Sequence, residues 1–352
     1  VRRKEVAAML NFTGSFSEQG VIDGEGKDSS RPLIMSAYLS GSRIEPGYPE
    51  PRGTLTSLGS SASGDGLFTS GSWSQEGVFK FEKRLNHPMT QSLMRIQTTG
   101  SSSGQINNWL LYNVIARKEN KATGVKGSVS LYAAPGKTSP ASVLKVDMPN
   151  LNIFDGSKWH VSFGRKRADS DLNHSSSYFL RVGKNTISGF FLTESIGYLV
   201  DSSDNPLNVI NPALNASGAF LTVGSMSLGY DPAWTFNTFL NSHSDIDSKQ
   251  VNFTGKVGGL RFFSKALTKN ETSTHVKNFK SVGVENPLVN YSFTNKETGS
   301  FERLRVDMSL DQIVTESNAA GRIEAFDFSQ NLFHGTGTGF EANKRIIVPE
   351  TF

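Results

Sequence analysis

The sequence Phe-Asp-Gly-Ser-Lys-Trp-His-Val-Ser-Phe at residues 154–163 is the stretch that most constrains the fold. Its Asp-Gly-Ser part is a turn signal, because these residue types tolerate the backbone angles of tight turns. The turn leads into a Trp and then into alternating polar and apolar side chains. Such alternation is typical of a strand with one buried face. We therefore expect a strand in which Trp159 faces the core and His160 alternates outward to the surface.

Later segments follow this strand in a fixed order. They are 177–183 (Ser-Tyr-Phe-Leu-Arg-Val-Gly), 218–225 (Gly-Ala-Phe-Leu-Thr-Val-Gly-Ser), 252–263 (Asn-Phe-Thr-Gly-Lys-Val-Gly-Gly-Leu-Arg-Phe-Phe) and 264–272 (Ser-Lys-Ala-Leu-Thr-Lys-Asn-Glu-Thr). The series resembles the laminin-G-like family, in which a D-G-x-W-H-x-V strand leads to a Y-x-L-x-V-G strand, an L-x-V/I-G strand and a closing F-x-G-x-V/I-x-x-L/V-R strand. An A-L-S/T-x-x-E helical turn follows the last of these. The resemblance implies an all-β, antiparallel concanavalin A-like (laminin-G-like) jelly-roll β-sandwich.

The local residue patterns agree with this fold. Thr268 precedes Glu271 at capping-box spacing, so its hydroxyl can accept from the free N–H groups at the start of a short helix. Turn residues bound each expected strand, as an antiparallel sandwich requires. Further strands are expected at residues 77–81, 93–96, 109–116 and 128–132.

The chain divides into three parts by composition. Residues 1–65 are expected to form an extended N-terminal arm and linker with one strand at 31–39, which docks on its own sandwich or on a neighbouring subunit. Residues 66–295 form the sandwich. Residues 296–352 form a strand-forming C-terminal tail or the start of a further module, because residues 327–331 read D-F-S-x-N.

Patterns within the tail are also informative. Residues 322–331 alternate as a strand does, and residues 335–339 are expected to form a Gly-rich turn. The chain begins with Val1 rather than Met, as expected of a processed product or a segment of a longer polypeptide.

Composition excludes several classes of protein. The net charge is +4, and the tight basic clusters are residues 2–4 and residues 165–167, the second expected in a solvated hairpin loop. We therefore expect no nucleic-acid partner. The absence of Cys excludes disulfides and Cys-based zinc sites. No apolar run reaches the roughly 18 residues of a membrane span, so we expect no membrane insertion.

The sequence matches known catalytic motifs only incompletely. Glucanases of this fold carry Glu-x-Asp-x-x-Glu on one strand, and the closest acidic cluster, at 245–247, lacks the flanking Glu. Residues 100–104 match G-x-S-x-G, but the helix that this motif requires does not follow. We expect a protein that is not an enzyme.

Two kinds of binding site have candidate residues. A sugar site needs an exposed aromatic ring beside polar groups, and the candidates are Trp234 with Asp231 and Asn237, followed by Trp109. A core or subunit-contact role explains the same aromatic residues. No cofactor is required; calcium is the metal that the resemblance implies.

The candidate calcium ligands are Asp201 and Asp204, in a segment whose composition is also typical of a polar turn.

The function expected from these features is a non-enzymatic structural component of a virus particle, associated with its capsid, tail or fibre. The D-F-S-x-N opening and the laminin-G-like strands resemble virion structural proteins of tailed phages and large DNA viruses. Its partners would be other subunits, contacted through the arm and the tail. The alternative is a carbohydrate-binding or adhesion module of a microbial or viral surface protein, located outside the cell and contacting host glycans.

Overall fold

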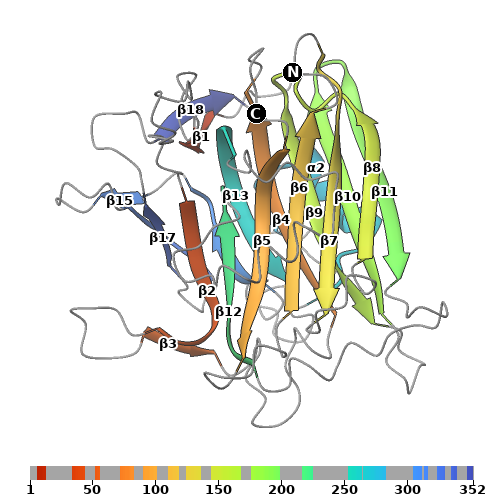
Figure 1. Ribbon diagram of the computed structural model, residues 1–352. Helices are drawn as coiled ribbons and strands as arrows, with labels where there is room; N and C mark the ends of the chain where they lie inside the picture. The colour runs from red at the N-terminus through yellow and green to blue at the C-terminus, as the bar shows by residue number, and fades with distance from the viewer. Residues whose placement is uncertain are drawn as a thin grey trace, which may run out of the picture.

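Two antiparallel β-sheets face each other in the computed structural model (Figure 1), which confirms the predicted all-β, jelly-roll type of sandwich. The narrower laminin-G-like assignment stays a prediction. The structure describes residues 6–12, 34–43, 52–55, 72–82, 90–100, 110–118, 124–135, 144–167, 176–198, 216–224, 253–263, 265–282, 304–310, 313–315, 323–329, 334–338 and 347–351.

The first sheet, sheet A, contains eight strands. In spatial order they are β11 (Gly189–Tyr198), β10 (Ser176–Thr186), β9 (Lys158–Arg167), β4 (Trp73–Phe81), β13 (Gly255–Phe263), β1 (Val6–Asn11) and β18 (Ile347–Thr351), with β14 (Leu304–Met308) beside β13. The strand predicted from residues 154–163 is β9, near the middle of this sheet.

The second sheet, sheet B, contains ten strands. In spatial order they are β15 (Ile313–Thr315), β16 (Ile323–Ala325), β17 (Gly335–Thr338), β2 (Ile34–Arg43), β12 (Ala216–Val223), β5 (Thr90–Gly100), β6 (Leu110–Lys118), β7 (Gly127–Pro135) and β8 (Leu144–Leu151), with β3 (Arg52–Leu55) beside β2.

Strands from both ends of the chain lie within these sheets. β1 pairs with β18, from Val6 opposite Thr351 to Leu10 opposite Ile347, and also with β13. β2 lies between β17 and β12 in sheet B. The described strands of the predicted arm and tail therefore pair inside this chain. The domain boundaries at residues 65 and 295, and contacts of these parts with other subunits, stay predictions.

The core lies between the sheets and is rich in aromatic side chains. Trp73 packs against Tyr112 of sheet B and against Phe163 and Phe262 of sheet A, with ring centroids 4.9, 5.6 and 5.8 Å apart. Trp159 is buried in the same core, as predicted. Such contacts across the two sheets bury large apolar areas, which is the main source of stability for a sandwich.

Two local predictions are wrong. Residues 335–338 were expected in a Gly-rich turn, but they form β17, which pairs with β16 and β2. Residues 165–167 were expected in a solvated loop, but β9 continues through them. Arg165 is paired with Trp73 and Tyr178 and is buried. In both places, hydrogen bonding to neighbouring strands overrides the local loop signal.

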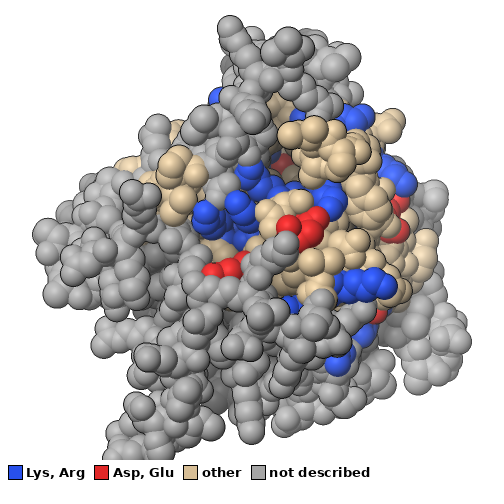
Figure 2. Space-filling view, turned by 90° about the horizontal axis from the view of Figure 1, so that it is seen from above, with Lys and Arg blue, Asp and Glu red and all other residues tan. Residues whose placement is uncertain are grey.

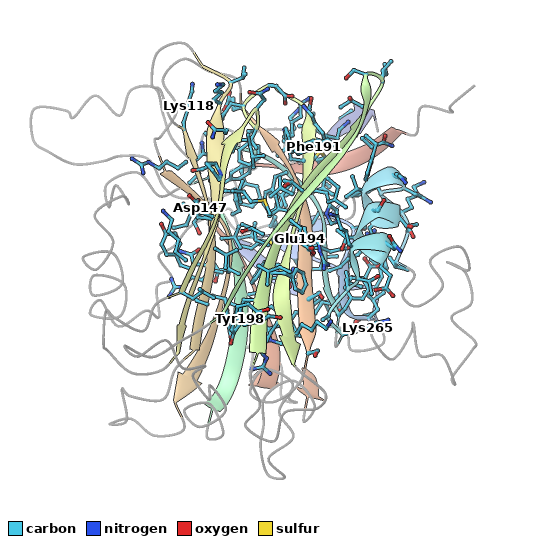
Figure 3. The ribbon with its side chains drawn as sticks, turned by 90° about the vertical axis from the view of Figure 1, so that its right-hand side faces the viewer. Lys118, Asp147, Phe191, Glu194, Tyr198 and Lys265 are labelled. Carbon is cyan, nitrogen blue, oxygen red and sulfur yellow. The ribbon has the colours of Figure 1, made fainter. Side chains whose placement is uncertain are left out.

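One helix, α2 (Lys269–Lys277), covers part of the outer face of sheet A. It begins as the sequence predicts, because the Thr268 hydroxyl accepts from the Glu271 N–H and the Glu271 carboxylate accepts from the Thr268 N–H. Figure 3 shows the helix lying beside the strands, with side chains between them. Within the described parts of the chain, no helix has the length and apolar character needed to cross a membrane.

Candidate functional site

The binding residues expected from the sequence lie outside the described residues. This holds for Trp234, Asp231 and Asn237, for Trp109, and for Asp201 and Asp204. The glycan and calcium sites therefore stay predictions. Among the residues that are described, no group of three or more His, Asp or Glu side chains is arranged to hold a metal ion.

The turn before β9 is held by a single carboxylate. Asp155 accepts from the Ser157 N–H at 2.8 Å, from Trp159 Nε1 at 3.2 Å and from Lys184 Nζ at 2.5 Å. Burial raises the pKa of Asp155, but the hydrogen bonds from Lys184, Ser157 and Trp159 outweigh it and lower that pKa. The Lys184 ammonium lies 4.4 Å from the Trp159 ring centroid, which adds a cation–π contact. The turn thereby fixes the loop end of β10 onto the core.

A cluster of charged residues lies buried between α2 and the outer face of sheet A. Glu76 of β4 is 1% exposed. Its Oε2 atom lies 3.1 Å from Nε2 of His160 in β9 and 3.0 Å from Nδ1 of His275 in α2. Its Oε1 atom lies 3.3 Å from the guanidinium of Arg261 in β13. We call Glu76, His160, His275 and Arg261 the buried cluster.

The cluster shifts the pKa of its central carboxyl. Burial raises the pKa of Glu76, but the charges of His275 and His160 and their hydrogen bonds oppose this and hold the pKa well below its ordinary value. The ionised carboxylate is thus the form that this site stabilises. It joins two neighbouring strands to the helix that covers them.

Arg261 extends the cluster to the segments after α2. Its guanidinium donates to the carbonyl groups of Ser281 at 3.1 Å and of Phe279 at 2.6 Å, and it lies 3.2 Å from Asp307 in β14. Burial raises the pKa of Asp307, while Arg261 opposes this rise. Arg261 therefore fastens the chain after the helix to sheet A.

The prediction that His160 lies on the surface is wrong. His160 does point away from the core, as the alternation indicates, but it is 4% exposed because α2 and the buried cluster cover it. Every member of the cluster is less than a tenth exposed. A general acid or base must come within hydrogen-bond reach of its substrate, so this arrangement suits a structural role better than a catalytic one.

The exposed apolar side chains gather elsewhere, at one edge of sheet A. Six large hydrophobic side chains are exposed in the described parts of the chain, and five of them lie in β11 or in the loop that joins it to β10. These five are Ile187, Phe190, Phe191, Ile196 and Tyr198, at 98, 42, 40, 53 and 58% exposure. We call them the apolar edge. Large exposed apolar patches mark interaction sites.

β11 itself is a regular strand. Its ten residues pair with β10 from Ser177 opposite Tyr198 to Thr186 opposite Gly189, without a register shift. Figure 3 looks directly onto this strand, and Phe191, Glu194 and Tyr198 follow one another along it. Among described strands, β10 is its one hydrogen-bonded neighbour.

Sequence reasoning missed this strand. The segment reads Gly-Phe-Phe-Leu-Thr-Glu-Ser-Ile-Gly-Tyr, and Ile187 and Ser188 form the short turn that precedes it. The Phe-Phe-Leu run after a two-residue turn flanked by Thr and Gly is a hairpin signal that could have revealed the strand. It could not have revealed the exposure, which depends on where sheet A ends.

Charge does not mark a separate site on the face seen from above. There, basic and acidic side chains of the described residues are interspersed, without a large patch of either sign (Figure 2). The exposed large hydrophobic side chains of the described residues, by contrast, gather mostly at the apolar edge.

Comparisons with known proteins add the following. No family model and no curated protein matches the sequence. Among solved structures, the enzymatically active domain of bacteriophage CBA120 tailspike protein 2 is similar to it at 10% identity and a TM-score of 0.34, over 69% of this chain and 30% of that chain. The CBM40 domain of Ruminococcus gnavus IT-sialidase, bound to α2,3-sialyllactose, is similar at 11% identity and a TM-score of 0.30, over 67% of this chain and 99% of that chain.

A third similar structure is an alginate lyase from Pseudomonas aeruginosa, at 11% identity and a TM-score of 0.25, over 62% of this chain and 86% of that chain. The chain thus spans less than a third of the length of the tailspike structure. Similarity at these identities and TM-scores carries no argument about function, which has to come from the chain itself.

Proposed function

We propose that this protein is a non-enzymatic structural component of a virus particle that acts through protein–protein contacts. The apolar edge is the observation that carries this proposal. Five of six exposed large hydrophobic side chains gather on one hairpin, whereas a sandwich acting alone would be expected to scatter them. The virus particle is the setting that the sequence resemblance to virion proteins implies.

The buried cluster supports the non-enzymatic part of the proposal. It brings together two histidines, a carboxylate and a guanidinium, which are groups that catalytic sites use. His160, His275 and Arg261 each contact Glu76, which connects β9, β13 and α2 to β4, and Arg261 also contacts Asp307 in β14. Buried charged residues that connect neighbouring elements in this way support a scaffold.

The test uses the protein from its native source. Particles are separated on a density gradient, and an antibody against the chain is used to probe every fraction. We expect the protein to sediment with the particles. Recovery only in the slow, soluble fractions contradicts the proposal. Truncation before residue 66 is not a suitable test, because it removes β1 and β2 from the two sheets.

The alternative function, carbohydrate binding at an extracellular surface, needs a separate test. Its candidate residues, Trp234 with Asp231 and Asn237, and Trp109, lie outside the described part of the chain. A glycan array with calcium present measures it directly, and Trp234→Ala is the matched variant. Saturable binding that this variant loses would favour the carbohydrate-binding function.

A further inference from the structure

The two sheets end side by side at β8 and β11, and these two edges differ. The strands approach closely, since a Cβ atom on Gly197 of β11 would lie 2.9 Å from Val146 Cγ2 of β8. β8 carries the exposed residues Lys145, Asp147 and Pro149, and its pairing with β7 is shifted near Val129. Charges, proline and bulges are the devices that keep edge strands from pairing with other chains.

β11 lacks most of these devices. Its ten residues contain no Pro, Lys or Arg, and its register with β10 is unbroken. Its one charged residue, Glu194, forms an ion pair with Arg181 of β10. A long, regular and apolar edge strand without protection is a template for another strand.

We infer that β11 pairs with β11 of a second copy of this chain, antiparallel and about a twofold axis that passes beside Glu194. This inference rests on the proposed function, because it names the partner at the apolar edge. Such a contact is isologous, so one surface serves both copies, and it joins the two A sheets into one continuous sheet.

The register about Glu194 brings apolar side chains together. It places Phe190 opposite Tyr198 of the second copy and Leu192 opposite Ile196 of the second copy. All four side chains lie on the same face of the sheet as Glu194, because residues two apart along a strand share a face. Aromatic and branched cross-strand pairs of this kind stabilise antiparallel sheets.

The backbone groups also fit this register. In an antiparallel ladder, every second residue directs its N–H and C=O away from the neighbouring strand. A twofold axis beside one residue pairs even-numbered residues with even-numbered ones and odd with odd. The outward groups of one copy therefore always meet the outward groups of the other.

The charge of the edge favours a second copy as the occupant. The whole chain carries a net charge of +4, so a contact between two copies is favoured where it brings no unpaired like charges together. β11 adds no unpaired charge of its own, because the Arg181 guanidinium pairs with Glu194 within each copy, and the nearby Lys277 ammonium of α2 lies over the Phe190 ring, 4.6 Å from its centroid. Arg181 is itself fixed by the Leu267 carbonyl at 2.5 Å and by Thr272 Oγ1 at 3.1 Å.

Sedimentation equilibrium of the full chain over a range of concentrations tests the inference. We expect a dimer, with twice the 38.3 kDa mass of the chain. Ile196→Lys places a charge opposite Leu192 of the second copy and should weaken self-association at least about tenfold. The control is Phe328→Lys, because Phe328 is 52% exposed but lies outside the apolar edge, and this variant should remain dimeric.

Single cysteines test the register, since the chain has no cysteine of its own. A residue on the twofold axis lies opposite the same residue of the second copy at a Cα separation of about 5 Å, which a disulfide can span. Glu194→Cys should therefore cross-link under oxidation. Phe190→Cys is the control, because the two residues 190 lie eight positions apart, about 27 Å along the strand.

Glu194→Cys removes the ion pair with Arg181, so a second variant tests the register with that ion pair retained. The double variant Thr193→Cys with Ser195→Cys keeps Glu194 and places each thiol opposite its counterpart on the second copy. It should give the same covalent dimer. Circular dichroism and thermal unfolding of every variant show whether the sandwich is intact.

The outcomes separate this inference from the proposed function. A wild-type chain that stays monomeric, an Ile196→Lys variant that dimerises as the wild type does, or cross-linking at residue 190 but not at residue 194 overturns the β11 pairing. The proposed function survives each of these if the protein still sediments with particles. It fails by itself if the chain dimerises through β11 but never enters a particle.

Discussion

The outer face of sheet A is covered at its centre and open at its edge. At the centre, Glu76 and Arg261 are buried beneath α2, although both are charged. At the edge, Ile196 and Tyr198 are exposed on β11, although both are largely apolar. This reverses the usual distribution, in which charges face water and large apolar groups are buried. The difference teaches that charged groups can be buried where they contact one another beneath the helix, whereas large apolar groups stay exposed where the sheet ends.

The covered centre should respond most strongly to mutation. Glu76→Ala removes the carboxylate that both histidines and Arg261 contact, and leaves their polar groups buried without it. Breaking a buried ion pair from one side costs about 3–5 kcal/mol of unfolding free energy. Chemical denaturation measures this loss. Glu76→Gln keeps an acceptor oxygen and should lose less, whereas a loss below about 1 kcal/mol for Glu76→Ala would show that the cluster does not hold the cover in place.

The contribution of Glu76 should also depend on pH. Its folded-state pKa lies well below the ordinary value of 4.5, because the histidine contacts outweigh the opposing effect of burial. On acidification the unfolded chain therefore binds the proton before the folded one does. The stability that ionised Glu76 contributes is complete above the ordinary value and is lost as the pH falls through the folded-state pKa. Unfolding of the wild type and of Glu76→Gln should converge on acidification, and a constant difference between them would contradict this account.

The start of the helix cover should show a smaller effect. Thr268→Ala removes the side chain that accepts from the Glu271 N–H at 3.2 Å, which should cost about 1 kcal/mol. Thr274→Ala is the matched control, because the Thr274 hydroxyl is exposed and bonds only the Asn270 carbonyl within the helix. Equal losses in thermal unfolding for the two variants would show that the cap does not anchor α2.

The open edge should show the smallest effect on the isolated chain. Ile187→Ser changes a side chain that is 98% exposed in the β10–β11 loop, so the unfolding free energy of the monomer should change by no more than about 0.5 kcal/mol. The measurement is made at a concentration low enough to keep the chain monomeric. A clearly larger loss would mean that the apolar edge packs within its own chain.

Sequence reasoning identified the scaffold, because its signals are local. The turn before Trp159, the alternation through Phe163 and the cap at Thr268 each depend on a few adjacent residues, and each appears in the structure. The burial of His160 could not be foreseen. It depends on His275, which is distant in the sequence and is brought over the strand by α2.

The surface features were hidden for a similar reason. Phe190 and Phe191 look like core residues in the sequence, and only the position of β11 at the end of sheet A exposes them. The strand β1 was likewise obscured by its polar surroundings, since its partners are more than two hundred residues away. Patterns within one strand reveal its two faces, but they do not reveal its place in the sheet.

Amide hydrogen exchange at low and high protein concentration tests the central claim most directly, because it compares the β11 and β8 edges in one experiment. If β11 is a contact surface for a second copy, amides within Gly189–Tyr198 should become protected as the concentration rises, while those of Leu144–Leu151 should not change. Exchange in β11 that is the same at every concentration would contradict the claim.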